Sequence, residues 1–234
     1  MIAMAFNKSP YYQLPIEWSL RWFNDLLADQ RLQEAAVNSV LIATATAVIA
    51  GALGTLAALG LARYRFFGRG FLKALLLPPI AIPWVIIGCA MLILAFWTGI
   101  GRGLHAILIS HVALSLPYAI MVVGSRIAGQ GTACEEAAAT LGANPRQVAL
   151  RITLPLIAPG IVAASLFSFA TSFDMFVISY FLAAPGQTTL PVEIYASIKE
   201  GFTPVINVVS TILILVSFVL AVLISRLHDF GTKQ

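Results

Sequence analysis

Hydrophobic and polar positions along this chain are separated into long blocks rather than interleaved. Five stretches contain no Asp, Glu, Lys or Arg, and each is at least 22 residues long: 35–62, 74–101, 103–125, 152–173 and 201–225. About 20 apolar residues suffice for an α-helix to cross the hydrocarbon core of a bilayer. The pattern therefore predicts an all-α, polytopic helical membrane protein with five transmembrane helices, over about 35–62, 71–97, 104–125, 154–181 and 204–225.

Residues 1–34 follow a different pattern, because aromatic side chains alternate with charges of both signs. Apolar residues recur at helical spacing within 19–29, at Leu20, Phe23, Leu26 and Leu27. This spacing predicts an amphipathic helix that lies on the membrane surface. We expect residues 1–34 to form an external segment ahead of the first span.

Composition narrows the class of protein further. Hydrophobic residues make up 59% of the chain and charged residues 10%, whereas about 25% of a typical globular protein is charged. A soluble, secreted or disordered chain is excluded on this ground. The net charge of +4 comes from residues between the apolar blocks, so the expected partner is membrane lipid and no nucleic acid. The sequence has no cluster of Cys and His residues that predicts a metal site.

The distribution of Lys and Arg predicts the orientation. If the loop between the first two spans is cytoplasmic, nine of the 14 basic residues lie on that side. Because cytoplasmic loops carry an excess of Lys and Arg, we expect the amino terminus outside and residues 227–234 to form a cytoplasmic tail.

Prolines occur within three of the predicted spans. Each lacks a backbone N–H and crowds the preceding turn, so a break or kink is expected at each. Prolines are also frequent in membrane helices in general, and for Pro117 an unbroken helix is equally expected. The full set is Pro78, Pro79, Pro83, Pro117, Pro155 and Pro159.

The segment 126–155 is too structured to be a plain connector. Glu135 and Glu136 begin a run of helix formers, where carboxylates favour the positive end of a helix. Gly142 suits the left-handed position after a helix. Asn144 can then cap a second helix that has Pro145 first and Gln147 third, as in a capping box. The sequence predicts a helix, a tight turn and a second helix that runs into the fourth span.

Such a helix-turn-helix has three interpretations. A DNA reader needs more positive charge than Arg146 and Arg151 supply. Ordinary solvated packing is a second possibility. The third is a docking helix, in which the small side chains of 137–139 allow close approach to a partner and Glu136 provides a charged anchor.

At these residues the chain resembles a known family. The integral-membrane permease subunits of binding-protein-dependent ABC importers carry an EAA motif, followed at fixed spacing by Gly, Ile and Leu-Pro. Here the corresponding residues are Glu136, Ala137, Ala138, Gly142, Ile152, Leu154 and Pro155. The resemblance implies the type I ABC importer permease fold, with these residues and Glu135 coupling the chain to an ATPase.

Further segments resemble the second permease of spermidine/putrescine importers. They are 63–68, Ser110-His111 with Leu116-Pro117, Ser172-Phe173-Asp174, and Leu190-Pro191 through Tyr195. Permeases for iron, phosphonates and other solutes share much of this pattern. Such permeases usually have six spans that begin inside, so we expect either that the start has been placed late or that this chain lacks the first helix.

The resemblance also implies a set of partners. These are an ABC ATPase dimer, a second homologous permease, a periplasmic or lipid-anchored solute-binding protein and a small-molecule solute. The chain has no GxxxxGK[ST] loop, so ATP and Mg belong to the ATPase and no cofactor is expected on this chain. The implied location is the bacterial inner (plasma) membrane, as a multi-pass protein.

Asp174 is the candidate residue for the solute pathway, because it is an ionisable group within an otherwise apolar span. It lies 19 residues after Pro155, or about 28 Å along a helix, which places it near the outer mouth. A role as an interfacial or capping carboxylate is equally compatible. Tyr180 and Tyr195 are the further pathway candidates, while His105 and His111 are expected to be polar packing residues.

The expected function is a non-catalytic permease subunit that forms half of the pathway of an ATP-driven importer, with polyamine as the cargo. The same architecture could instead carry iron, a phosphonate or an amino-acid-like compound. An unrelated channel would not need the EAA motif, and an intramembrane enzyme would need a nucleophile, base or metal cluster that the sequence does not offer.

Overall fold

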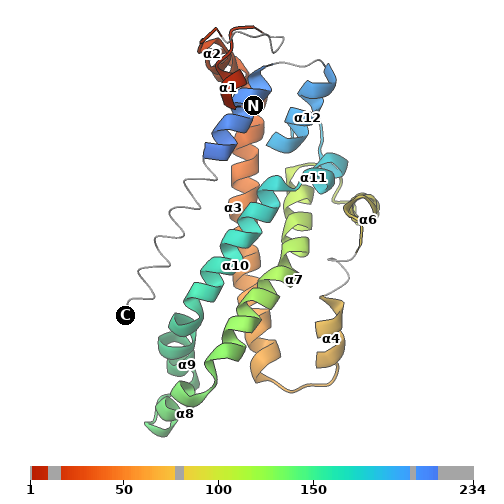
Figure 1. Ribbon diagram of the computed structural model, residues 1–234. Helices are drawn as coiled ribbons and strands as arrows, with labels where there is room; N and C mark the ends of the chain where they lie inside the picture. Colours follow the sequence, from red (N-terminus) through yellow and green to blue (C-terminus); the bar gives the residue numbers. More distant parts are fainter. Residues whose placement is uncertain (1, 10–16, 77–81, 201–203, 216–234) are drawn as a thin grey trace. The chain divides into compact units, whose positions relative to one another are not determined.

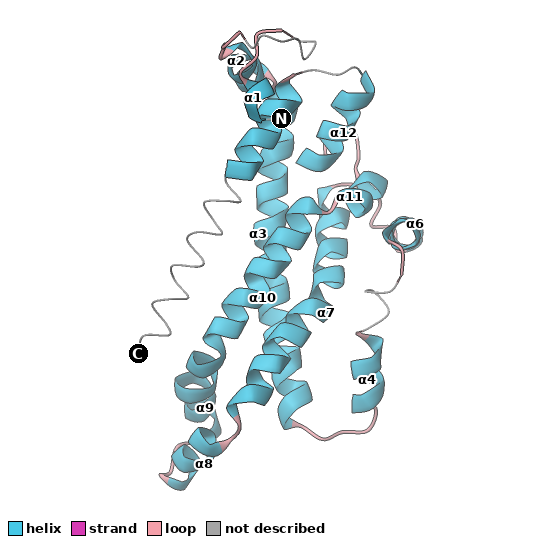
Figure 2. Cartoon of the chain, viewed as in Figure 1, coloured by secondary structure: helices cyan, strands magenta, loops and turns pink. Residues whose placement is uncertain are grey.

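The computed structural model describes residues 2–9, 17–76, 82–200 and 204–215. Helices dominate the described part of the chain (Figures 1 and 2), where the only β pairing consists of two isolated bridges, Asn7 with Trp18 and Ala184 with Gln187. The predicted all-α class is confirmed. The helices are α1 (Ile2–Ala5), α2 (Arg21–Ala28), α3 (Gln30–Arg63), α4 (Arg69–Leu75), α6 (Trp84–Trp97), α7 (Leu104–Gln130), α8 (Ala133–Thr140), α9 (Pro145–Val148), α10 (Leu154–Asp174), α11 (Phe176–Leu182) and α12 (Leu190–Glu200).

The chain forms two compact units, Met1–Ala35 with Val192–Gln234, and Ala36–Pro191. In the first unit the predicted amphipathic segment forms α2, but its buried residue is Trp22. The indole Nε1 of Trp22 donates a hydrogen bond to the Asn7 carbonyl over 2.7 Å. Leu20 and Leu27 are instead exposed. An indole whose N–H is hydrogen-bonded buries more apolar surface than a leucine side chain does. This explains why Trp22 is buried and Leu20 and Leu27 are not.

The second unit is built on close contact between long helices. Around α7 and α10, small residues permit the approach: a Cβ on Gly54 would lie 2.6 Å from the Ala119 Cβ, and one on Gly160 would lie 2.8 Å from the Arg126 Cβ. Such positions are typical of helix packing in membranes. The resulting core includes Val123 and other fully buried apolar side chains of α7 and α10.

Among the described residues, three helices are long and apolar enough to cross a membrane. They cover Gln30–Arg63, Leu104–Gln130 and Pro145–Asp174, and correspond to the first, third and fourth predicted spans. Trp84–Trp97 and Val205–Leu215 are shorter apolar helices. Residues 216–225 of the fifth span and the tail 227–234 lie outside the described residues. The count of five spans therefore stays a prediction.

The second predicted span, 71–97, is not one continuous helix. α4 ends at Leu75, and α6 begins only at Trp84 with Pro83 as its N-cap residue. Pro83 has an extended ψ of 132°. A proline at this position cannot donate the next helical hydrogen bond and disfavours helical geometry in the residue before it. Pro78 and Pro79 lie outside the described residues.

The fourth predicted span, 154–181, is also divided, but not at a proline. α10 runs through Pro159 and ends at Asp174, so the break expected at Pro159 is wrong. α7 continues through Pro117, which agrees with the alternative of an unbroken helix there. The break occurs at Met175, where φ is −74° and ψ is 85°. α11 then begins in a new direction, packed against α6 and α7 around Ile107, Ile178 and Leu182.

Candidate functional site: the 126–155 loop and the Asp174 pocket

The 126–155 loop contains the predicted helix-turn-helix. α7 extends to Gln130, and α8 then begins after Thr132 with both carboxylates in its first turn. Carboxylates in the first turn favour the positive end of the helix dipole. The Thr132 hydroxyl donates to Glu136 Oε1 over 2.6 Å, which further fixes the start of α8.

The turn after α8 has the predicted geometry. Gly142 has a φ of +86°, a left-handed conformation that residues with a Cβ rarely adopt. Asn144 and Gln147 form the capping box: the Gln147 N–H donates to Asn144 Oδ1 over 2.9 Å, and the Asn144 N–H donates to Gln147 Oε1 over 3.0 Å. Pro145 opens α9. The local structure predicted for the loop is therefore confirmed.

α9 passes into α10 through a wider turn. Residues Ala149–Thr153 form a π-helical segment, and Pro155 follows in the first turn of α10. Pro155 has no N–H to bond the carbonyl of Arg151, so the widening occurs where a regular helix would lose a hydrogen bond. The helix is thus widened at Pro155 rather than broken.

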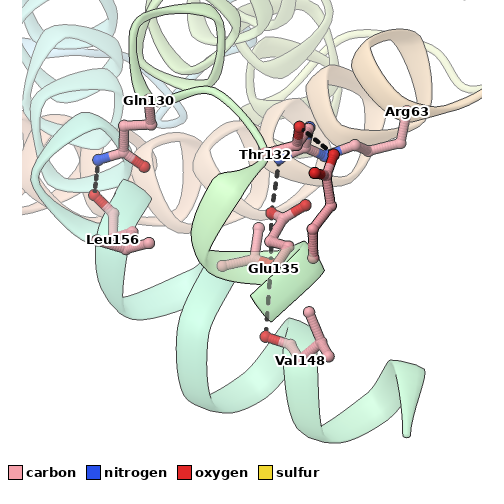
Figure 3. A network of polar contacts seen from close by, with 8 residues as sticks. Arg63, Gln130, Thr132, Glu135, Val148 and Leu156 are labelled. Carbon is pink, nitrogen blue, oxygen red and sulfur yellow. Dashed lines mark hydrogen bonds and ion pairs between the residues drawn. The ribbon is translucent and has the colours of Figure 1, made fainter. Parts of the chain in front are cut away.

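Glu135 ties the loop to the end of α3 (Figure 3). Its Oε1 accepts a hydrogen bond from Arg63 Nη2 over 2.6 Å and another from the Thr153 hydroxyl over 2.8 Å. The Arg63 and Glu135 side chains are only 28% and 19% exposed. Gln130 Nε2 also donates to the Leu156 carbonyl, over 2.5 Å. One carboxylate therefore joins α3, α8 and the π-helical segment.

Other residues of the loop are exposed. Glu136 and Ala137 are exposed, and Leu141 at the turn is 89% exposed. A Cβ at Gly142 would meet nothing within 4 Å. Of the remaining motif residues, Ala138, Ile152 and Leu154 are half-buried, and Pro155 is exposed. The exposed positions of the loop thus include an acidic one at Glu136, an apolar one at Leu141 and one without a side chain at Gly142.

Asp174 lies where α10 ends, at a pocket of about 520 Å³. Trp84 of α6, Thr171 and Phe176 also line this pocket. An exposed carboxylate beside an indole can bind an organic cation by charge attraction and by a cation–π contact. The break at Met175 positions Asp174, because it ends α10 directly after this residue.

The other two pathway candidates are placed separately. Tyr180 in α11 is not among the described residues that line the Asp174 pocket, but its ring lies 5.5 Å from that of Phe176, which is. Tyr195 belongs to α12 in the other compact unit, where the Lys199 ammonium lies 4.8 Å from the centre of its ring. The pathway roles of Tyr180 and Tyr195 stay predictions.

A buried polar cluster beside the helix break was not predicted as a unit. His111 Nδ1 lies 2.8 Å from the Ser172 hydroxyl of α10, and His111 Nε2 lies 3.1 Å from the Ser179 hydroxyl of α11. Ser172 also donates to the Thr46 hydroxyl over 3.3 Å. His111 thus connects both sides of the break, which agrees with its predicted packing role. His105 is exposed, with Nε2 2.9 Å from the Ile100 carbonyl.

Comparison with known proteins decides the family. Residues 39–232, which include the whole 126–155 loop, match the family described as the binding-protein-dependent transport system inner membrane component. The chain belongs to this family. It is thus a membrane permease component of a transport system, as the EAA motif predicts.

Two relatives are polyamine permeases of Escherichia coli strain K12. The chain is 36% identical to the putrescine transport system permease protein PotI, over 92% of this chain and 79% of PotI. It is 33% identical to the spermidine/putrescine permease PotC, over 95% of this chain and 84% of PotC. A molybdenum transport permease, ModB of Mycobacterium bovis, is 35% identical over 77% of this chain and 73% of ModB.

Two solved ABC transporters share the fold. A chain of a bacterial transporter that imports alginate aligns with a TM-score of 0.73 and 20% identity, covering 96% of this chain and 87% of its own length. The methionine transporter MetNI aligns with a TM-score of 0.64 and 19% identity, covering 85% and 97%. The fold is that of ABC transporter permeases.

Proposed function

We propose that this permease forms half of the translocation pathway of an ATP-driven importer for polyamines of the putrescine and spermidine type. The observation that carries the cargo assignment is the identity of 36% and 33% to PotI and PotC over more than nine tenths of this chain. The Asp174 pocket supports it, because a carboxylate and an indole that line one pocket suit an ammonium group. The same architecture with another small solute is the alternative.

In this proposal the 126–155 loop couples the chain to a partner ATPase. Glu136 and Leu141 are exposed, so they are available for a partner surface. The ATPase dimer binds ATP and Mg and hydrolyses the ATP. Its closure then moves α10 through the loop as a rigid-body displacement.

The remaining partners and the orientation are part of the same proposal. A second homologous permease completes the pathway, and a solute-binding protein delivers the cargo. The amino terminus lies outside and the carboxyl terminus lies in the cytoplasm, which is the orientation that the excess of basic residues favours.

Uptake in cells tests the cargo. We expect cells that depend on this chain to accumulate labelled putrescine or spermidine, and Asp174→Asn to slow that uptake several-fold because it removes the charge and keeps the shape. Asp25→Asn is the matched control, since Asp25 is paired with Arg21 and does not line the pocket. Equal loss in both variants, or unchanged uptake in Asp174→Asn at low salt, would remove Asp174 from the pathway. Uptake of a different solute and no polyamine would overturn the cargo.

A further inference from the structure

A second pocket, of about 540 Å³, lies between α3, α4 and α7 and shares no lining residue with the Asp174 pocket. Gly131 and Thr132 line it as well, so it lies at the end of the unit that carries α8. Most of its wall is apolar, with Leu76, Ile120 and Met121 among the lining residues. Its remaining wall is basic.

Two positive charges in this pocket lack a counter-charge among the residues that the structure describes. Arg69 and Lys73, one turn apart on α4, line the pocket together with Arg63. Arg63 is paired with Glu135, but no acidic side chain is among the described residues that line the pocket. The Nε of Arg69 is buried and has no hydrogen-bond partner in the described structure. A buried unpaired donor is costly, so an anion at this position would remove that cost.

The outer surface of α4 indicates where this pocket lies with respect to the bilayer. None of the α4 residues is buried, and Phe71 and Leu75 are 71% and 55% exposed. Tyr64 and Phe67, just before α4, are 70% and 105% exposed. Exposed aromatic residues next to Arg and Lys are typical of the membrane–water interface. The basic wall therefore lies at the depth of lipid headgroups, and the apolar wall lies at the depth of acyl chains.

We propose that this pocket binds an anionic phospholipid, with the phosphate between Arg69 and Lys73 and an acyl chain against Ile120 and Met121. Basic pockets between transmembrane helices are suited to such headgroups. A soluble phosphate compound would satisfy the same two cations, but it would leave the apolar wall uncovered. One phospholipid molecule would contact the basic wall with its phosphate and the apolar wall with its acyl chain.

Native mass spectrometry of the full chain in detergent tests the proposal, with dioleoylphosphatidylglycerol as the probe and dioleoylphosphatidylcholine as the neutral comparison. We expect a one-to-one complex with phosphatidylglycerol that is favoured at least about tenfold over phosphatidylcholine. The double variant Arg69→Gln with Lys73→Gln should lose this preference. The matched control, Arg65→Gln with Arg146→Gln, should keep it, because neither residue lines the pocket.

A second variant tests the pocket without changing charge. Gly124 lines the pocket, and a Cβ on it would meet nothing within 4 Å. The Gly124→Leu variant should therefore fold. Its leucine side chain should occupy the space beside the apolar wall and so reduce phosphatidylglycerol binding. Equal lipid preference in the wild type and all variants would overturn the site, as would equal loss in the Arg65 and Arg146 control. Binding of glycerol 3-phosphate as tight as that of phosphatidylglycerol would overturn the lipid assignment.

Discussion

The pair formed by Arg63 and Glu135 can be tested by a double-mutant cycle that uses Arg63→Gln and Glu135→Gln. Exposed ion pairs contribute about 0.2–1 kcal/mol, whereas hydrogen bonds to charged groups contribute about 1.5–3 kcal/mol. The two side chains are 28% and 19% exposed, which lies between these cases. We therefore expect a coupling free energy of about 1–2 kcal/mol. Gln at position 135 keeps an acceptor for both Thr153 and Arg63, so the cycle measures what the two charges contribute.

The assay is reversible unfolding of the full chain in mixed detergent micelles, from which the free energy of unfolding of each variant is obtained. Glu136→Gln is the matched control, because Glu136 is exposed and its contact is the local one with Thr132. Its free energy of unfolding should change by no more than about 0.5 kcal/mol. Additive effects of Arg63→Gln and Glu135→Gln, or an equal loss in Glu136→Gln, would refute the reasoning that Glu135 is the structural carboxylate of the loop.

Three further predictions concern coupling, orientation and the helix break. Gly142→Leu should abolish uptake, because it adds backbone strain of about 1–2 kcal/mol and places a side chain on the loop that is proposed to bind the ATPase. Gly99→Leu, at a similar φ of +74° in open space, should cost similar stability and keep uptake. In a background without the two native cysteines, Cys at Gly68 should be labelled only from the cytoplasm and Cys at Gly186 only from outside; the reverse would overturn the orientation. His111→Ala should lower the free energy of unfolding by about 1–3 kcal/mol, since it removes the two buried hydrogen bonds of the imidazole with Ser172 and Ser179; a free energy of unfolding equal to that of the wild type would contradict this.

The features that could be predicted from the sequence are those that depend on residues only a few positions apart in the chain. The capping box of Asn144 depends on a residue three positions away, and the left-handed turn depends on Gly142 itself. The apolar blocks likewise predict α3, α7 and α10, because burial in lipid depends on composition over a single helix.

The features that were missed depend on distant residues. Arg63 and Glu135 are 72 residues apart, and nothing near either one identifies the other. The break at Met175 has no Pro or Gly to indicate it. It is instead accompanied by contacts of His111 with Ser172 and Ser179, which come from another helix. Tertiary contacts of this kind override local propensity.

The continuity of the helix from Pro145 to Asp174 has a mechanical consequence. These 30 residues extend about 45 Å at 1.5 Å per residue, so a tilt of about 5° imposed at the turn would move the far end by about 4 Å. The break at Met175 ends this helix at Asp174, so the far end carries the Asp174 carboxylate. In the proposed coupling, a small rotation of this helix at the loop would change the width of the Asp174 pocket, because α11 packs against α6 beyond the break.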